Sequence, residues 1–297
     1  SIEDDCMRRD LTINALYTNL STGEIVDITG KGVDDIKNHI IRTPNDPDTI
    51  YDDDPLRILR CIRFASRYGW EIEYDTYEGM VRNVSRLEII TKERVKDEFC
   101  KMLTCKHPIM AMELLRKIGA MHYVIPELEE TYSMTQNEYH FGTVWEHTMV
   151  VLEGTKDDNM ILRISALLHD IGKIRVCTEE DGKIHFLKHE LKSGEMIDEL
   201  LRPLKFSNEI IKEVTFLVRN HMICKTWGSE CEYMKDKKLR RFQYECKTEE
   251  RFRNLMTIID ADNNAYAADK CMPKQVEFIL SRTEAMKAEG SAMFGYK

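Results

Sequence analysis

Apolar residues recur every three or four positions through most of the chain after residue 55, as they do in amphipathic helices. Leu56, Leu59 and Ile62 form the first such stripe. Gly69 and Gly119 each follow a stretch of this kind and fit helix C-termini. The pattern predicts helices over Pro55–Tyr68, Asp75–Val84, Thr91–Leu103, Pro108–Ile118, Val144–Gly154, Asp158–His169, Lys192–Leu201, Ser207–His221 and Glu250–Asp269, with one more after Pro273.

The first 46 residues follow a different pattern, in which short alternating stretches are separated by turn residues. It predicts strands at Leu11–Leu20, Ile25–Ile28 and Ile40–Arg42 and a short helix near Val33–Asn38. Thr43–Asp48 contains two prolines and is predicted to be a linker. The fold class expected from both patterns is mainly α, with a small α/β portion at the N-terminus.

Composition limits the classes of protein to consider. The chain has 297 residues, which is enough for two or three domains, and 42% of them are hydrophobic. A net charge of −9 argues against indiscriminate nucleic-acid binding but leaves room for local basic tracks. The nine cysteines form no C-x-x-C pair, which predicts reduced thiols and a cytoplasmic location. No apolar run reaches the ~18 residues of a membrane span, so we expect no membrane partner.

The stretch Asp52–Phe64 carries the first candidate chemistry. Asp54 fits a helix N-cap before Pro55, and Arg57 lies three residues further on, so both side chains can point into one space. A carboxylate accepts hydrogen bonds and a guanidinium donates them. This pair matches the amine and ring nitrogen of cytosine or adenine, and it would repel uracil and guanine. Ordinary helix capping beside a solvated arginine stripe explains the same residues.

A second motif lies upstream, where residues 8–15 read RRDLTINA. With Asp53–Arg57, it resembles the RRDFTINA and EDPLR motifs of class II CCA-adding tRNA nucleotidyltransferases and bacterial poly(A) polymerases. Leu11 and Asp53 depart from the family pattern. The resemblance covers nearly the whole chain. It implies the end of a nucleotidyltransferase palm (1–46), a helical neck and RNA-binding region (47–130), an HD domain (140–270) and a helical tail (271–297).

The resemblance also implies an activity, which is the addition of C, C and A to tRNA 3′ ends from CTP and ATP with Mg²⁺. Arg9 would contact the triphosphate, and Asp10 and Asn14 would organise the ribose side. Asp54 and Arg57 would select the base. The nucleotide-binding residues implied are Arg8, Arg9, Asp10, Asn14, Asp54, Arg57, Arg60 and Arg63, with the last two holding phosphates.

Glu93, Arg94 and Glu98 resemble a further family motif that braces the base-reading pair, although surface ion pairs explain them equally well. The family's Asp-x-Asp pair, which holds the metals for transfer, would lie upstream of the RRDLTINA segment. Ser1 is not an initiator Met, and we expect the chain to be a fragment without that catalytic pair.

The most specific short motif is Leu167–Lys173, which places His169 and Asp170 before a glycine. With His147 upstream and an aspartate downstream, it resembles the HD superfamily of metal-dependent phosphohydrolases. Two imidazoles and two carboxylates can hold a divalent cation such as Mg²⁺, Mn²⁺ or Ni²⁺ and activate a water. The predicted metal ligands are His147, His169, Asp170 and Asp262, with Asp260 as the alternative to the last.

Three further residues are candidates for catalysis at the HD motif. Lys173 could stabilise the charge of a departing phosphate, and His189 and His221 could bind a second metal or a phosphate. The remaining histidines are predicted to be structural or surface residues: His39, His107, His122, His140 and His185.

Two alternatives to CCA addition stay open at this stage. Poly(A) polymerases share the motifs of the N-terminal half. A stand-alone HD phosphohydrolase whose N-terminal half only binds RNA would share the motifs of the C-terminal half.

Overall fold

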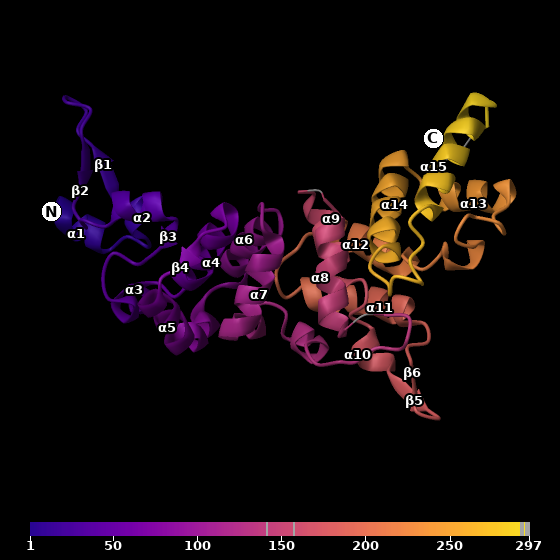
Figure 1. Cartoon of the computed structure of the whole chain (residues 1–297), viewed down its shortest axis with the longest axis horizontal. Coiled ribbons are helices and arrows are strands. Elements are labelled where there is room, and N and C mark those ends of the chain that lie inside the picture. Colours follow the sequence, from indigo (N-terminus) through magenta and orange to yellow (C-terminus); the bar gives the residue numbers. More distant parts are fainter. Residues whose placement is uncertain (141, 157, 292–293, 295–297) are drawn as a thin grey trace. The chain divides into compact units, whose positions relative to one another are not determined.

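The computed structural model describes residues 1–140, 142–156, 158–291 and 294. These residues are mainly helical, with three short two-stranded sheets, which confirms the predicted fold class. Residues 1–129 form one compact unit and residues 130–297 form a second (Figure 1). None of the helices within the described part of the chain has the length and apolar character that crossing a bilayer requires.

The first unit opens with a small α/β portion. It contains α1 (Ile2–Met7), the antiparallel strands β1 (Leu16–Thr18) and β2 (Ile25–Asp27), α2 (Gly32–Asn38) and β3 (Ile40–Ile41), which pairs in parallel with β4 (Glu71–Ile72). The prediction of one strand over Leu11–Leu20 is wrong in its first part. Thr12–Asn14 forms a 3₁₀ turn there, and the Thr12 hydroxyl donates to buried Asp35 at 2.7 Å.

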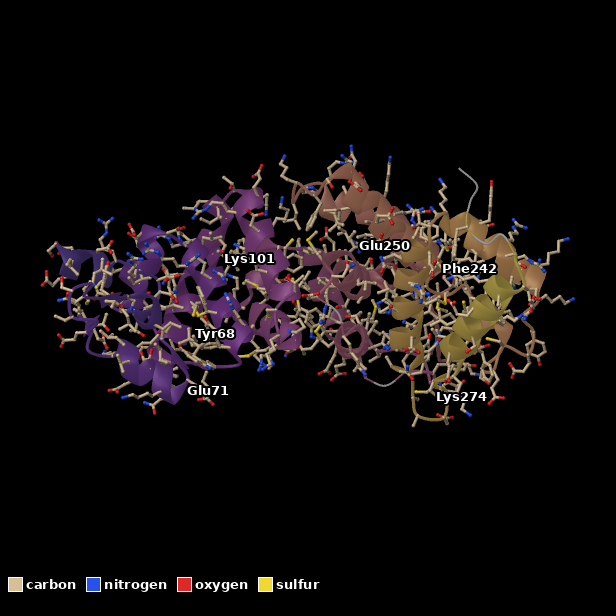
Figure 2. All side chains as sticks on the ribbon, turned by 90° about the horizontal axis from the view of Figure 1, so that it is seen from above. Tyr68, Glu71, Lys101, Phe242, Glu250 and Lys274 are labelled. Carbon is tan, nitrogen blue, oxygen red and sulfur yellow. The ribbon has the colours of Figure 1, made fainter. Side chains whose placement is uncertain are left out.

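Five helices complete the core of the first unit. They are α3 (Pro47–Asp53), α4 (Leu56–Tyr68), α5 (Tyr74–Asn83), α6 (Lys92–Leu103) and α7 (Pro108–Ile118). The last four match the prediction within one residue at each end. Helix α3 begins inside the predicted linker, because Asp46 caps it and Pro47 occupies its first position. Leu59 and Ile62 are fully buried, as their spacing predicts. Tyr68 and Glu71 mark the passage from α4 to β4 (Figure 2).

The second unit is a helical bundle with one hairpin. Its elements are α8 (Val144–Gly154), α9 (Met160–Leu168), α10 (Lys173–Val176), β5 (Thr178–Glu180), β6 (Lys183–His185), α11 (His189–Leu201), α12 (Asn208–Asn220), α13 (Asp236–Cys246), α14 (Glu249–Asn263) and α15 (Gln275–Ala288). Helices α8, α9, α12 and α14 pack against one another. Apolar residues of these helices, including Ile164, Leu167, Val214 and Ile258, are almost fully buried.

The sequence predicted most of these helices but misplaced some ends. Helix α11 begins at His189 rather than Lys192, and α14 ends at Asn263 rather than Asp269 because Asn264 caps it. Helices α10 and α13 and the β5–β6 hairpin were not predicted. The polar end of the predicted tail, after residue 291, lies largely outside the described residues.

Candidate active sites

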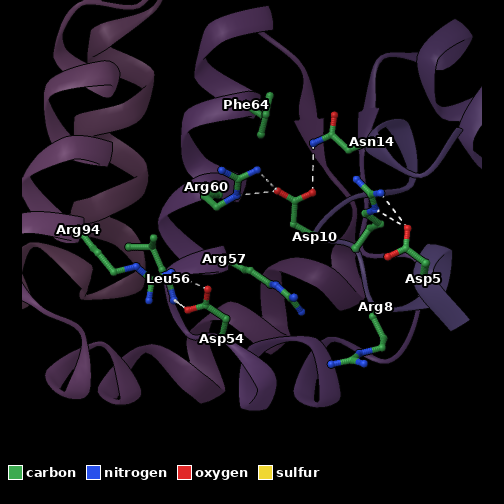
Figure 3. Close-up of a pocket in the computed structure, with 11 residues that line it drawn as sticks. Asp5, Arg8, Asp10, Asn14, Asp54, Leu56, Arg57, Arg60, Phe64 and Arg94 are labelled. Carbon is green, nitrogen blue, oxygen red and sulfur yellow. Dashed lines mark hydrogen bonds and ion pairs between the residues drawn. The ribbon is translucent and has the colours of Figure 1, made fainter.

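The first unit contains a polar cavity with a volume of about 850 Å³. Seven of the eight predicted nucleotide-binding residues line it: Arg8, Arg9, Asp10, Asn14, Asp54, Arg57 and Arg60. The segment around residues 8–14 and the N-terminal half of α4 form facing parts of its wall (Figure 3). The structure therefore brings the two sequence motifs together, although they lie about forty residues apart.

Asp10 is the central acceptor of this cavity. Its side chain is buried, and Arg60 donates to one carboxylate oxygen from Nε and from Nη2, each at 2.7 Å. Asn14 donates to the other oxygen at 3.1 Å. A charge-assisted fork of this kind is among the stronger polar contacts in proteins. It fixes the orientation of Arg60 on α4 relative to the Asp10 loop.

Asp54 and Arg57 both line the cavity, but each has a partner of its own. Asp54 accepts from the backbone N–H of Leu56 at 3.1 Å. The predicted N-cap role of Asp54 is wrong by one position, because α4 begins at Leu56 and Pro55 is its N-cap. Arg94 of α6 pairs with the second oxygen of Asp54 at 2.7 Å. Arg57 pairs with Asp53 at 3.0 Å and donates to the Ile50 carbonyl at 3.2 Å. Both side chains are thus held in place.

The two arginines of the first motif differ in their surroundings. Arg9 donates to Asp5 at 2.8 Å and to the Tyr17 hydroxyl at 3.2 Å. Arg8 is 75% exposed, and Asp53 lies 4.0 Å away. A cation that is exposed at the edge of a cavity remains available for an anionic group.

Arg63 is the one predicted residue that does not line the cavity. Its guanidinium is nearly buried and donates to Glu98 of α6 at 2.5 Å. The same carboxylate lies 3.8 Å from Arg60. Arg63 therefore braces α4 against α6. This position outside the cavity differs from the prediction that Arg63 holds a phosphate. Arg63 also lies over the ring of Phe64, at 4.2 Å from the ring centroid.

The sequence reasoning missed several cavity residues. Asp5 and Phe64 belong to the lining but carry no spacing signal of their own, and Leu56 was assigned only to the apolar stripe of its helix. Arg94 was noticed only through a resemblance, and the structure places it against Asp54. The contact between Arg94 and Asp54 forms because α6 packs against α4. Forty residues separate the two side chains, so local sequence could not reveal it.

The second unit holds the HD motif at the end of α9. His147, His169, Asp170 and Asp262 are all almost fully buried and meet in one cluster. His147 Nε2 lies 3.1 Å from Asp262 Oδ1 and 3.5 Å from Asp170 Oδ2. His169 Nε2 lies 3.3 Å from Asp170 Oδ2 and 3.6 Å from Asp262 Oδ1. The four predicted metal-binding side chains thus point their ligand atoms into one small space.

Backbone carbonyls orient the imidazole rings of this cluster. Nδ1 of His147 bonds to the Ala265 carbonyl at 3.1 Å, and Nδ1 of His169 bonds to the Ala166 carbonyl at 2.7 Å. The rings of His189 and His221 are held in the same way. Each Nδ1 carries a proton in such a bond, so Nε2 is the ring nitrogen that faces the centre of the cluster.

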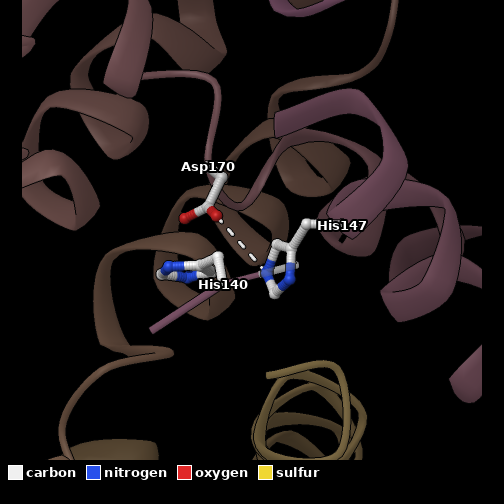
Figure 4. A group of neighbouring side chains, drawn as sticks. All are labelled: His140, His147 and Asp170. Atoms are coloured by element: carbon white, nitrogen blue, oxygen red, sulfur yellow. Dashed lines mark ion pairs between the residues drawn. The ribbon is translucent and has the colours of Figure 1, made fainter. Parts of the chain in front are cut away.

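The three candidate catalytic residues also reach the cluster. Lys173 Nζ lies 2.7 Å from Asp170 Oδ2, and His189 Nε2 lies 3.0 Å from Asp170 Oδ1. Nε2 of His221 lies 3.5 Å from the same oxygen. His140, predicted to be structural, is a further member, because its ring faces His147 and Asp170 (Figure 4). His140 lies in a loop, so no periodic pattern in the sequence marked it as a member of the cluster.

The cluster strongly attracts positive charge. Burial alone would raise the pKa of Asp170, but His169 and Lys173 hold that pKa well below its usual range. Burial disfavours the charged ring of His169, yet Asp170 and Asp262 outweigh it and raise the pKa of that ring to about 10. Burial and the nearby Lys173 lower the pKa of His140 to about 3, so its ring is neutral.

The residues of the cluster fit a divalent cation. Three overlapping sets of imidazole nitrogens and carboxylate oxygens each lie within 4.8 Å of one another. Nε2 of His221 is buried and has no hydrogen-bond partner among the described residues, which is unusual for such an atom. Imidazole and carboxylate ligands together suit Zn²⁺ and other transition metals, and carboxylates also suit Mg²⁺ and Mn²⁺.

The structure separates the two downstream aspartates. Asp262 lies in the cluster, where Lys225 pairs with its second oxygen at 2.9 Å and the Tyr266 hydroxyl donates at 3.4 Å. Asp260 lines a different cavity and accepts from Asn264. The geometry thus favours Asp262 over Asp260 as the ligand.

Comparison with known families finds three matching domain models. The chain matches the model of the poly(A) polymerase head domain over residues 1–42. It matches the probable RNA- and SrmB-binding site of polymerase A over residues 69–131, and the HD domain over residues 104–263, which is more than half of the chain. The chain belongs to the CCA-adding enzyme and poly(A) polymerase family that carries an HD domain. HD domains and nucleotidyltransferases of this family imply the use of divalent metals.

Relatives of this family share about a third of the aligned residues. A multifunctional CCA protein from Neisseria gonorrhoeae is 32% identical over 229 residues, covering 75% of this chain and 54% of the relative. Another from Actinobacillus pleuropneumoniae is 33% identical over 237 residues, covering 75% of this chain and 56% of the relative. The chain thus spans a little more than half the length of these relatives.

Solved structures of the family share the fold. The CCA-adding enzyme of Bacillus stearothermophilus in complex with CTP has a TM-score of 0.63 at 19% identity, covering 98% of this chain and 66% of that one. A tRNA nucleotidyltransferase complexed with a primer tRNA and an incoming ATP analogue has a TM-score of 0.63 at 18% identity, covering 97% and 75%.

Proposed function

We propose that this chain supplies the nucleotide-selecting cavity, the RNA-binding region and the HD domain of an enzyme that adds CCA to tRNA 3′ ends. The observation that carries the proposal is the convergence of Asp10, Asp54, Arg57 and Arg60 on one polar cavity. Relatives named multifunctional CCA proteins support it. Its substrates are CTP, ATP and tRNA, and Mg²⁺ serves the transfer step.

Base selection follows from the chemistry of Asp54 and Arg57. The Asp54 carboxylate accepts the exocyclic amine of cytosine or adenine, and an N–H of Arg57 donates to the ring nitrogen beside it. Asp53 and the Ile50 carbonyl hold Arg57 in place before the base arrives, so little side-chain freedom is lost on binding. Exposed Arg8, together with Arg9, faces the triphosphate.

Equilibrium binding of the four nucleoside triphosphates tests this assignment. CTP and ATP should bind roughly 10–100-fold more tightly than UTP and GTP, which corresponds to one well-placed polar contact. Arg57→Ala should remove most of that preference. Arg202→Ala, which removes an exposed arginine of the second unit, is the matched control and should leave it unchanged. Equal affinity of the parent chain for all four nucleotides would contradict the assignment.

Product analysis separates CCA addition from polyadenylation. A protein that contains this chain is incubated with tRNA lacking its terminal CCA and with CTP, ATP or both, and the 3′ ends are sequenced. Ends that read CCA support the proposal, whereas runs of A identify a poly(A) polymerase.

The HD cluster is assigned a separate hydrolytic activity. We infer that His147, His169, Asp170 and Asp262 hold a divalent ion such as Mg²⁺, Mn²⁺ or Ni²⁺. When bound, such an ion lowers the pKa of a coordinated water and polarises a phosphoryl oxygen. Lys173, 2.7 Å from Asp170, places a positive charge beside the phosphate site. The substrates are phosphomonoesters or 2′,3′-cyclic phosphates, and release of inorganic phosphate from a monoester measures the activity.

A further inference from the structure

The cavity that Asp260 lines has no role in the functions proposed above. Its volume is about 420 Å³, within the range of small-molecule sites. Three elements line it: the C-terminal end of α8, one face of α14, and the first two turns of α15, which lies beside α14 (Figure 1). The cavity is thus formed mainly where helices of the second unit pack together.

The part of the lining that α14 contributes combines a carboxylate with apolar surface. Four side chains reach the cavity from one face of this helix, at the spacing i, i+3, i+4 and i+7: Arg253, Met256, Thr257 and Asp260. Met256 precedes Asp260 by four residues, which places the two about 6 Å apart along the helix axis. Val276 and Leu280 of α15 add further apolar surface to the lining. An apolar region therefore lies one helical turn away from a carboxylate.

Asp260 reaches this cavity without a charged partner. Its side chain is partly buried, and one carboxylate oxygen accepts from the Asn264 amide at 3.3 Å. Among the described residues, no cation forms an ion pair with Asp260, and its second oxygen has no hydrogen-bond donor. A carboxylate that has lost part of its water without gaining a cation remains a strong acceptor for a charged donor.

The other charges at the cavity do not neutralise Asp260. Arg253 is itself neutralised, because it pairs with Glu249 at 2.7 Å and with Glu284 at 3.2 Å. Lys156 is exposed, so water screens its charge. Helix α8 ends at the cavity, and the carbonyls of its last turn carry partial negative charge. The charge that remains to be neutralised inside the cavity is therefore negative.

We propose that this cavity binds an alkylammonium group, with the ammonium on Asp260 and the aliphatic chain against Met256 and Leu280. An ammonium only donates hydrogen bonds, which suits the free carboxylate oxygen. A metal ion would need several ligands, and Asp260 is the only carboxylate among the described residues that line the cavity. The group belongs either to a free amine or to a lysine side chain of a partner protein, because lysine carries its ammonium on a four-carbon stem. The proposal is independent of the nucleotide and metal sites.

Calorimetric titrations of the chain with three probes test the proposal. n-Pentylamine carries both the charge and the chain near neutral pH, 1-pentanol has the chain without the charge, and ammonium chloride has the charge without the chain. The amine should bind at least about tenfold more tightly than either other probe, because a charged hydrogen bond and the burial of the chain each contribute such a factor. Equal affinity for n-pentylamine and 1-pentanol would overturn the proposal, and so would a parent chain that binds no amine.

Two substitutions locate the binding site. Asp260→Asn should weaken n-pentylamine binding about tenfold and leave 1-pentanol binding unchanged, because the amide keeps the shape of the side chain but not its charge. Leu280→Ala should weaken binding of both, since it removes apolar contact. Glu277→Gln is the matched control, because Glu277 is an exposed carboxylate of α15 outside the cavity lining. An unchanged Kd for the amine in either cavity variant, with its fold verified by circular dichroism, would overturn the proposal.

A further titration distinguishes the two sources of the ammonium. Lysine blocked at both its amino and its carboxyl group presents the side-chain ammonium as a protein does. If blocked lysine binds as tightly as n-pentylamine, the site accepts a lysine side chain of a partner. If it binds more than about tenfold more weakly, the cavity is specific for a free amine, because the loss exceeds that of a single polar contact. Asp260→Asn must reduce binding in either case, and a Kd that it leaves unchanged again contradicts the proposal.

Discussion

Arg60 donates to Asp10 through two nitrogens, each 2.7 Å from the same carboxylate oxygen, although fifty residues separate the two. This fork joins the RRDLTINA segment to helix α4, which carries Arg57. Asp10 is 8% exposed and the Arg60 side chain 35%, so the carboxylate side of the contact is shielded from water and the pair is stronger than a fully exposed one. The geometry of the proposed nucleotide cavity therefore depends on a pair that neither motif shows by itself.

We predict that Asp10→Asn and Arg60→Gln each weaken CTP binding about tenfold, because either substitution frees the other side chain from its position. The double variant should be little worse than either single one, since the same fork is lost in each case. A double-mutant cycle on Kd measures the coupling. Fully additive losses would show that the two side chains act on the nucleotide independently.

The sequence predicted the helices of this chain well, because most carry a regular apolar stripe. Helix α13 was missed because its stripe is short and strongly basic residues surround it. The β5–β6 hairpin has only three residues in each strand, all without a buried side chain, so no alternation could mark it. Local pattern thus predicts elements with a long regular apolar stripe and fails for short hairpin strands and for a helix whose stripe is interrupted by basic residues.

The same limit applies to the sites. Motif spacing indicated Asp54, Arg57 and the His169–Asp170 pair, which are close in sequence. It could not predict that Arg63 turns toward Glu98, because that contact depends on the packing of α4 against α6. His140 joins the HD cluster from a loop, where no periodicity exists. Contacts that arise from tertiary packing leave no trace in the local sequence.

Glu98→Gln should destabilise the first unit by roughly 3 kcal/mol, since it leaves nearly buried Arg63 without its charge partner. Hydrogen exchange of the α4 and α6 amides measures the free energy of opening. The neighbouring Asp97→Asn is the control, because its side chain is 65% exposed and its change should stay within about 0.5 kcal/mol. Equal effects of the two substitutions would contradict a bracing role for Glu98.

His169→Ala and Asp262→Asn should each abolish stoichiometric binding of Mn²⁺ or Ni²⁺, because each removes a ligand atom from the cluster. Asp260→Asn should retain the metal, since Asp260 lies outside the cluster. Elemental analysis after dialysis against the metal gives the stoichiometry, and circular dichroism confirms that the variants fold. A full equivalent of metal in His169→Ala would refute the assigned ligand set, and loss of metal in Asp260→Asn would reopen the choice between the two aspartates.

Gly172 shows why the HD motif is followed by a glycine in this chain. A Cβ at this position would lie 2.4 Å from the backbone nitrogen of Ser193 and 2.5 Å from the carbonyl of His189, both on α11. Gly172→Ala should therefore push α11 away, weaken metal binding at least tenfold and cost about 1–3 kcal/mol of stability. Gly182→Ala is the control for metal affinity, since its Cβ would meet open space and the strain of its positive φ of 72° stays at the hairpin tip. Metal titrations followed by calorimetry compare the two variants with the parent. Unchanged affinity in Gly172→Ala would mean that the position of α11, and with it His189, does not control the metal site.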